Sequence, residues 1–290
     1  MKELLLSILV CSYNGGAKLQ RMLSSVQNQD APIGEIILLD DGSSPPLSNV
    51  GSKVEILRHV KRRGYISSRN ELARRSKNEF MFFFDDDVVL DNPLALRRAA
   101  GIMASDSTVG AVAFRQRAFD GTFPQLQPLY GSRVRQIATY FGWAHLIRRS
   151  AWERVGPFME MFEYGYEEAE FSLRLLDAGY KVMCDPMLSV IHDGADNSKD
   201  LAKRHFLNLR NTLLTYFLRY PAIRLPSWTK NFLLNVQPCP GARESILALR
   251  LRLMGAVVAK MPYLTVERKP VSNDAVSAYF GLQESAQSIE

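Results

Sequence analysis

Three consecutive carboxylates, Asp85, Asp86 and Asp87, follow the apolar residues 80–84. A short, continuous apolar run predicts a central strand that is buried on both faces. Each carboxylate at its end needs a partner, because desolvating one such ion costs several kcal/mol. Ligands bind at the carboxyl ends of strands in open α/β sheets, so we expect Asp85 and Asp87 to hold a divalent cation that bridges to a phosphate. Asp86 should point the other way, because strand side chains alternate; a solvated acidic turn is the alternative interpretation.

A second group of acids, Glu167, Glu168 and Glu170, lies where the apolar spacing predicts the start of a helix. The helix dipole favours acids there, and an i,i+4 pair with Arg174 is a sufficient reason for Glu170 alone. It does not explain three acids at one helix start. Like charges close together raise one another's pKa, and a raised pKa suits a general base near neutral pH.

The elements that must position these acids are buried strands in alternation with amphipathic helices. Strands are predicted at residues 4–11, 36–39, 54–57, 80–87 and 188–191, and helices at residues 17–29 and 64–75. This order predicts a parallel α/β half-domain with polar residues gathered at the strand ends. Residues 120–135 are rich in Gly, Pro, Gln and Tyr, and a loop of this length is typical of a lid or binding element.

Composition and cysteine usage narrow the class of protein. Of the 290 residues, 47% are hydrophobic and 23% are charged, which is typical of a soluble globular protein. The longest apolar runs fall short of the ~20 residues that a membrane span requires. Three cysteines lie far apart in the chain. This usage excludes a disulfide framework and a zinc ribbon, and it suits the reducing cytoplasm.

The positive charge of the chain is concentrated near its end. The net charge is +6, yet residues 201–270 contain 12 Lys and Arg and 2 Asp and Glu, a charge of +10. A basic segment of this kind favours a polyanionic partner or an anionic membrane surface. Nucleic acid is the weaker option and we expect none, because the chain has no zinc-finger spacing, RNA-recognition signature or basic zipper.

Two helices are predicted in this basic segment, at residues 203–220 and 243–261, with Pro221 and Pro226 ending the first. They either pack on the rest of the protein with solvated basic faces or dock on an anionic bilayer. Docking would gain ~1 kcal/mol for each basic residue near the surface. From Val271 on the chain is polar, and we expect a disordered tail there.

Motifs spread over about the first two hundred residues resemble those of glycosyltransferase family 2, and they follow one another in the same order as in that family. They are residues 7–14, 39–43 and 84–88, Gly64 with Arg69 and Asn70, Gly142, Arg148 and Arg149, residues 155–158 and 166–170, Arg174, Gly179 and Tyr180, and His192. There is no glycine-rich dinucleotide or P-loop pattern to support another nucleotide site. The resemblance implies the GT-A fold, an α/β fold with a Rossmann-like, mostly parallel central sheet flanked by helices, followed here by a C-terminal helical extension.

The same resemblance implies how the chain is divided. Residues 1–200 would form the GT-A catalytic domain, with a nucleotide-sugar-binding half at residues 1–115 and an acceptor half at residues 116–200. Residues 201–290 would form the basic helical extension with its polar tail.

For the metal, the resemblance implies that Asp87 ligates Mn²⁺ or Mg²⁺, with Asp85 nearer the ribose. His192 matches a family histidine that approaches the metal or the diphosphate; a structural histidine is the alternative. Hard oxygen ligands and a substrate diphosphate suit these ions, and an imidazole moves the preference toward Mn²⁺.

For the donor, the resemblance implies contacts at the ends of three strands. The nucleotide-sugar-binding residues would be Ser12, Tyr13, Asn14, Asp40, Arg69, Asp85 and Asp86. A carboxylate can accept the N3–H of uracil or thymine, so the role implied for Asp40 favours a UDP- or dTDP-linked donor. Asp41 would organise the turn that follows.

For the acceptor, the resemblance implies that Glu168 is the catalytic base. The family usually has Asp at this position, and glutamate is one methylene longer. Either the acceptor lies further out, or Glu167 shares the task. Trp143 lies where the family places acceptor-side residues, where its ring would stack on a sugar; core packing is the alternative.

We therefore predict an inverting, metal-dependent glycosyltransferase that acts on a glycan or lipid-linked acceptor hydroxyl. The helix with Arg204, Arg210 and Asn211 is similar to the tails of rhamnosyltransferases that build bacterial surface polysaccharides. A metal-dependent phosphoester or diphosphate hydrolase is the first alternative, but it needs more ligands, and the chain has only 4 His. An inactive sugar-nucleotide-binding protein is the second, against which the intact acids count.

Overall fold

The computed structural model describes residues 5–287 apart from 49, 119, 124–132 and 193–200. Its first half is a parallel sheet with the strand order β3-β2-β1-β4. The elements are β1 (Leu6–Ser12), α1 (Gly16–Gln27), β2 (Ile33–Asp40), β3 (Val54–Arg58), α2 (Tyr65–Arg75) and β4 (Phe80–Asp85). Each corresponds to an element predicted from the apolar pattern, so the predicted parallel half-domain is confirmed.

The second half continues the same sheet with both strand directions. Its elements are β5 (Val88–Val89), α3 (Ala95–Ser105), β6 (Val109–Arg117), β7 (Arg135–Ile137), β8 (Ala144–Arg148), α4 (Arg149–Val155), the short helix η1 (Glu160–Phe162), α5 (Glu167–Asp177) and β9 (Lys181–His192). Strand β8 runs antiparallel to both β4 and β6, whereas β9 is parallel to β6. Of the predicted lid at residues 120–135, residues 124–132 lie outside the described part of the chain.

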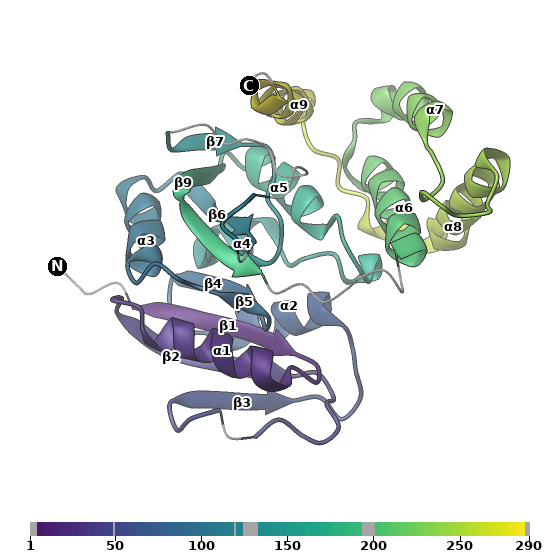
Figure 1. Ribbon diagram of the computed structural model, residues 1–290. Coiled ribbons are helices and arrows are strands. Elements are labelled where there is room, and N and C mark those ends of the chain that lie inside the picture. The colour runs from purple at the N-terminus through teal and green to yellow at the C-terminus, as the bar shows by residue number, and fades with distance from the viewer. Residues whose placement is uncertain (1–4, 49, 119, 124–132, 193–200, 288–290) are drawn as a thin grey trace.

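The side chains of the central strands alternate between two cores. In β4, Phe82 and Phe84 belong to the core beneath α1 and α3, whereas Met81 and Phe83 belong to the core beneath α2 and α5. Because both faces of the strand are covered, its sequence is continuously apolar instead of alternating. The α/β class, with a central sheet flanked by helices, is confirmed (Figure 1).

The C-terminal extension is helical, as predicted. It consists of α6 (Leu201–Arg219), the short helix η3 (Ala222–Arg224), α7 (Leu225–Asn235), α8 (Ile246–Glu267) and α9 (Asn273–Gln287). Helix α6 packs against α7 and α8, and α9 returns to the sheet side of the molecule to pack on α5 and β7 (Figure 1). None of the described helices combines the length and the apolar character that crossing a membrane requires.

Two features of the extension differ from the sequence expectation. Helix α7 was not predicted, because Pro226 suggested a break. Pro226 lies in the first turn of α7, where a backbone N–H has no partner within the helix, so its absence costs nothing. Residues 273–287, where a disordered tail was expected, form α9. Val276 and Tyr279 of this helix are buried in the core.

Candidate active site

The predicted site residues of the first half meet at one edge of the sheet. The register pairs Ser12 of β1 with Asp40 of β2, and Cys11 of β1 with Asp85 of β4. The carboxyl ends of three neighbouring parallel strands therefore lie side by side, as the positions of the polar residues predicted.

Three side chains beyond this edge could hold a metal ion. Strand β5 pairs with the end of β9, and Val88 lies opposite His192. This pairing places the imidazole of His192 near the end of β4. Ligand atoms of Asp85, Asp87 and His192 all lie within 4.8 Å of one another, and Nε2 of His192 is 3.0 Å from Oδ1 of Asp87. Two carboxylates and an imidazole are a donor set that fits Mn²⁺ or Mg²⁺. The buried Nδ1 of His192 has no hydrogen-bond partner among the described residues.

Asp86 points away from these three residues. Its carboxylate accepts a hydrogen bond from the hydroxyl of Ser12, at the end of β1. Burial raises the pKa of Asp86 to about 6; the Ser12 hydroxyl opposes this shift, and the charges of Asp87 and Asp85 add to it. The middle carboxylate thus lies apart from the other two, as expected, but strand alternation is not the reason. Strand β4 ends at Asp85, and Asp86 and Asp87 form the turn that follows it.

Tyr13 and Asn14 extend from β1 into the loop that faces the second strand. The ring of Tyr13 is exposed, and the guanidinium of Arg62 lies 4.3 Å from its centroid. Asn14 is in the left-handed region, where its amide N–H donates to Ser43 and its side-chain oxygen accepts from the N–H of Ser44. Asn14 therefore connects two loops. The ring of Tyr13 and the guanidinium of Arg62 together form a flat, positively charged surface beside them. Arg62 was missed because no motif contains it.

Asp40 and Asp41 are both buried, and the carboxylate of each accepts hydrogen bonds from neighbouring loops. Asp40 accepts from the backbone N–H groups of Ser43 and Leu47 and from the guanidinium of Arg58. Burial raises the pKa of Asp40, but these hydrogen bonds and the Arg58 charge outweigh it, so this pKa lies below its ordinary value. Asp40, and not Asp41 as expected, organises the turn, and its base-reading role stays a prediction.

Asp41 instead binds the loop after β3. Its Oδ1 lies 2.7 Å from Nδ1 of His59 and accepts from the N–H of Arg63, while Oδ2 accepts from the N–H of Gly64. This carboxylate fixes the start of α2. It therefore positions Arg69, one turn further along that helix.

Arg69 occupies a buried position between the metal-side carboxylates and helix α5. Its Nη2 donates to Oδ1 of Asp85 (2.8 Å) and to the carbonyl of Gly142 (2.7 Å). Its Nη1 donates to Oε1 of Glu167 (3.3 Å) and Oε1 of Glu168 (3.4 Å). One guanidinium thus connects the two acidic groups found in the sequence. Arg69 was predicted to contact the nucleotide sugar; its side chain is buried among these carboxylates, and that contact stays a prediction.

The first turn of α5 carries the two carboxylates that share this guanidinium. Glu167 is fully buried, and its Oε2 has no hydrogen-bond partner among the described residues. Burial raises the pKa of Glu168 well above its ordinary value, and the charge of Glu167 raises it further; Arg69 only partly offsets both. Gly142 leaves room for the pair, because a Cβ there would lie 2.0 Å from Oε1 of Glu168.

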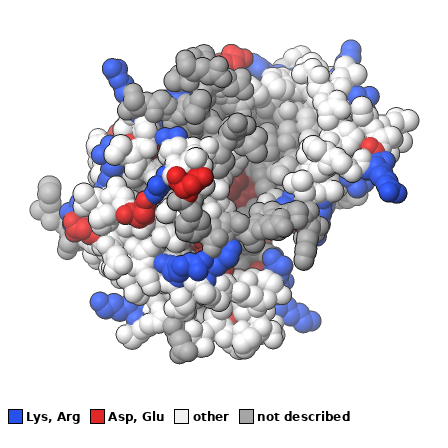
Figure 2. All heavy atoms as spheres, viewed as in Figure 1, with Lys and Arg blue, Asp and Glu red and all other residues white. Residues whose placement is uncertain are grey.

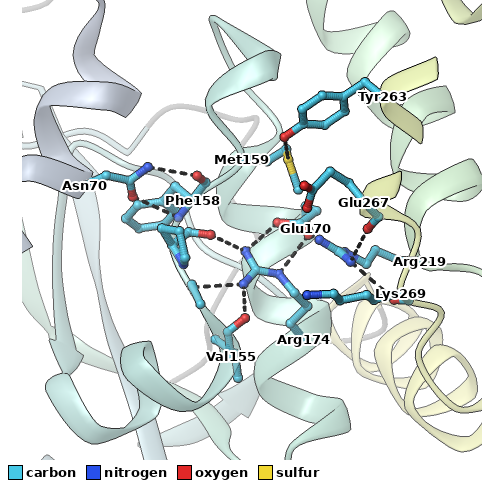
Figure 3. Close-up of polar contacts among 12 residues, drawn as sticks. Asn70, Val155, Phe158, Met159, Glu170, Arg174, Arg219, Tyr263, Glu267 and Lys269 are labelled. Carbon is cyan, nitrogen blue, oxygen red and sulfur yellow. Dashed lines mark hydrogen bonds and ion pairs between the residues drawn. The ribbon is translucent and has the colours of Figure 1, made fainter. Parts of the chain in front are cut away.

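Glu170, one turn further along α5, has a different environment (Figure 3). It accepts two hydrogen bonds from Arg174 and one, of 2.5 Å, from Arg219 of α6. Arg174 also donates to the carbonyls of residues 155–157, and Arg219 donates to those of Glu267 and Lys269. Glu170 therefore ties α5 to the extension, and the explanation of Glu170 by its pair with Arg174 is confirmed.

Trp143 lies at the metal side of this arrangement. Its Nε1 donates to the carbonyl of Phe114, and its ring centroid is 6.1 Å from that of His192. The ring of Phe141, which is exposed, stacks on it at 4.7 Å. Trp143 packs against the core, as its second alternative predicted, and Phe141 stacks on its ring. Stacking of Trp143 on an acceptor sugar stays a prediction. The surface is hollowed between the sheet and the extension, and acidic side chains are visible inside the hollow (Figure 2).

A family model for glycosyl transferase family 2 matches residues 7–162. The chain belongs to this family. The match contains the acids at the end of β4 and Arg69, and it ends before α5, so Glu167, Glu168 and His192 lie beyond it. The resemblance inferred from the motifs is confirmed.

Curated relatives of this family-2 chain are glycosyltransferases. An uncharacterized glycosyltransferase of Haemophilus influenzae is 35% identical over 86 residues, which are 29% of this chain and 29% of that protein. The pre-mycofactocin glycosyltransferase of Mycobacterium tuberculosis is 25% identical over 214 residues, covering 67% of this chain and 44% of that protein. The matched part of this chain thus spans less than half the length of either relative.

Solved structures share the fold at low sequence identity. The mannosyltransferase PcManGT of Pyrobaculum calidifontis, in complex with GDP-Man and Mn²⁺, has a TM-score of 0.59 at 17% identity, covering 100% of this chain and 82% of that one. TarS of S. aureus, residues 1–349 in complex with UDP-GlcNAc, has a TM-score of 0.57 at 15% identity, covering 90% of each chain. The GT-A fold of this chain rests on these likenesses together with the family.

Proposed function

We propose that this family-2 glycosyltransferase is metal-dependent and inverting, and that it moves a sugar from a UDP- or dTDP-sugar to a hydroxyl of a glycan or lipid-linked acceptor. The observation that carries the proposal is the position of Arg69. Its guanidinium bonds Asp85 of the metal group on one side and the pair Glu167 and Glu168 on the other. A leaving diphosphate and an acceptor hydroxyl held at these two groups would lie on opposite sides of one sugar.

In the proposed reaction the acceptor oxygen attacks the anomeric carbon as the bond to the diphosphate breaks. Glu168 takes the proton of the acceptor hydroxyl, for which a raised pKa is favourable. A divalent cation held by Asp85, Asp87 and His192 would neutralise the charge that develops on the diphosphate. Because base and leaving group are on opposite faces of the sugar, one displacement inverts the anomeric carbon.

The donor class is supported by the relatives, but its base is not decided by them. PcManGT is in complex with GDP-Man, whereas TarS is in complex with UDP-GlcNAc. Our preference for UDP or dTDP rests on the role implied for Asp40. Mn²⁺ is the ion in complex with PcManGT, and the imidazole of His192 favours the same ion here.

We further propose that transfer takes place in residues 1–200, with residues 201–290 as the basic extension, and that the product is a bacterial surface polysaccharide. The three free cysteines suit the cytoplasm, and the +10 charge of residues 201–270 suits the inner face of its membrane. The alternative of a metal-dependent hydrolase is disfavoured, since it needs further histidine ligands. His59 binds Asp41 and Glu71, His145 is buried, and His205 contacts a backbone carbonyl.

The metal site is tested with Asp87→Ala, compared with Asp30→Ala, which removes the same charge from an exposed pair with Arg97. In wild type and in Asp30→Ala we expect UDP or dTDP with Mn²⁺ to raise Tm more than ADP or GDP does. Asp87→Ala should lose turnover and the Mn²⁺-dependent rise. Full activity of Asp87→Ala, or of wild type in excess chelator, would exclude the metal site. Equal protection by all four nucleotides would exclude base reading by Asp40.

The inverting course is tested by the anomeric configuration of the product, read by NMR. An α-linked donor should give a β-linked product. A product that retains the donor's configuration would overturn the assignment of Glu168 as a base opposite the leaving group.

A further inference from the structure

Helix α8 is apolar on two faces, although only one of them is covered by the protein. Leu249, Leu253, Val257 and Leu264 are buried, and the helix packs against α6 through this side. A helix that is hydrophobic on all sides normally lies inside a protein or in contact with a membrane. The other face of α8 therefore requires an explanation.

The outward face of α8 is a row of exposed apolar residues at helical spacing. The row consists of Leu247, Leu251, Gly255, Val258, Pro262 and Val266. The side chains of Leu247, Leu251, Val258 and Val266 are 65%, 67%, 63% and 76% exposed. Single exposed apolar residues are normal, but a continuous row of this length marks an interaction surface.

The surface continues onto α7. Nη2 of Arg250 donates to the carbonyl of Leu234, the exposed residue near the end of α7. In Figure 2 the surface over α7 and α8, at the right of the view, is mostly uncharged, with Lys and Arg and some acidic side chains along its margin. We call the row on α8 together with Leu234 the α8 face.

Cations flank the α8 face. Arg250 and Arg252 lie one residue before and after Leu251, which places them about 100° to either side of the row. Residues 201–270 carry a charge of +10, and Glu267, near the end of α8, is the helix's single acid. An apolar face bordered by cations is the pattern of a helix that lies in the interface of an anionic bilayer.

We propose that the α8 face docks on an anionic phospholipid surface, with α8 lying in the plane of the interface. A second copy of this chain is the less favourable occupant, because two extensions of +10 would repel each other, whereas anionic lipids attract the same net charge. Of the two flanking cations, Arg252 also pairs with Glu244 at 2.9 Å. Docking would give the enzyme access to a lipid-linked acceptor, and this purpose of docking rests on the proposed function. The docking itself is testable without any turnover.

The test is co-sedimentation of the full chain with vesicles of phosphatidylcholine alone or mixed with phosphatidylglycerol. Wild type should bind the mixed vesicles at low salt, bind the neutral vesicles weakly, and be released as ionic strength rises. The double variant Leu251→Glu/Val258→Glu should lose binding by roughly tenfold or more, since it places charges where apolar groups were buried. Val60→Glu, at a 92% exposed position in the first half, is the matched control and should bind like wild type.

Three results would overturn the proposal: no binding of wild type at low salt, unchanged binding of the double variant, or equal loss in the Val60→Glu control. So would a wild-type dimer that the double variant converts to monomers while neither binds vesicles. Far-UV circular dichroism verifies that the variants are folded. Wild type that binds vesicles but transfers no sugar would contradict the proposed function and leave docking intact.

Discussion

Helix α5 carries two groups of carboxylates in contact with arginine, one turn apart, and their charge balance is opposite. At Glu170, two guanidiniums, Arg174 and Arg219, serve one carboxylate. At the start of the helix, the single guanidinium of Arg69 serves three carboxylates. Glu167 and Glu170 are fully buried, whereas Asp85 is 34% exposed, and the ratio of cations to anions differs between the two groups.

The pKa values follow this ratio. Burial raises the pKa of Glu170, but Arg174 and Arg219 outweigh it, so its pKa is lower than ordinary. Burial raises the pKa of Glu168, and Glu167 adds to the shift, so its pKa is higher than ordinary. A satisfied ion cluster holds the extension to α5, whereas the undersupplied one keeps the pKa of Glu168 raised, as the proposed role of a general base requires. The comparison teaches that adjacent acids of one helix titrate differently because their partners differ.

The largest effect is expected on kcat, from a change in the Arg69 cluster, where one guanidinium serves three carboxylates. Glu168→Gln keeps the shape of the side chain and removes the base, so kcat should fall roughly 10²–10⁴-fold. Stability should be unchanged or higher, because one of three mutually repelling carboxylates is removed. Steady-state kinetics and thermal melting measure the two quantities. A near-normal kcat would transfer the role to Glu167, for which Glu167→Gln is the next variant.

In the Glu170 cluster we expect the opposite result, a loss of stability with little change in kcat. Glu170→Gln leaves Arg174 and Arg219 buried without their carboxylate, and breaking such a pair costs about 3–5 kcal/mol of unfolding free energy. The kcat of the folded fraction should change little, because Glu170 lies on the extension side of α5. Denaturant unfolding followed by tryptophan fluorescence measures the loss. A variant that is stable but inactive would reverse our division of the two clusters.

Gly142 offers a smaller perturbation of the Arg69 cluster alone. In Gly142→Ala the new methyl would lie 2.0 Å from Oε1 of Glu168 and 2.7 Å from Nη1 of Arg69, so both must move. We expect a loss of about 1–3 kcal/mol in stability, together with a lower kcat. Gly101→Ala in α3, where nothing lies within 4 Å of the added methyl, is the control and should gain about 0.5–1 kcal/mol. Equal behaviour of the two variants would contradict the close packing at Gly142.

The smallest effect is expected in the pH dependence of stability, with opposite signs for the two clusters. Glu170 has a lowered pKa, so its stabilisation is present above the ordinary glutamate value of 4.5 and is lost as pH falls through the lower folded-state value. Glu168 has a raised pKa, so its protonated form stabilises the fold at low pH, and this contribution is lost as pH rises above 4.5. Unfolding free energies of wild type and the two Gln variants, compared across pH, measure both slopes. Slopes of the same sign would contradict the pKa directions.

The sequence predicted the part of this site that depends on local pattern. Apolar runs identified β1, β2 and β4. The separation of Asp86 from Asp85 and Asp87 was expected from strand alternation, although it arises in the turn after β4. Position along a strand does not reveal which carboxylate a loop will use, so the turn was given to Asp41, while in the structure Asp40 forms it. Both residues end the same strand, and the difference lies in loops that the pattern does not describe.

Arg69 shows the other limit of sequence reasoning. Its contact with Glu167 joins residues 98 positions apart, and the same guanidinium also donates to the carbonyl of Gly142. No local period encodes such contacts. Helix α9 was missed for a similar reason, because the apolar residues that it buries face α5 and β7, which come much earlier in the chain.

The return of α9 has a consequence for how the chain is made. A ribosome releases the strands and α5 first, and Val276 and Tyr279, which complete the core beside α5, leave it only later. Until then that part of the core lacks its cover, and exposed apolar surface in a nascent chain invites association with other chains. This part of the core can therefore close only after α9 has been made, and a stop codon before residue 273 should yield a protein that aggregates despite carrying every residue of the proposed active site.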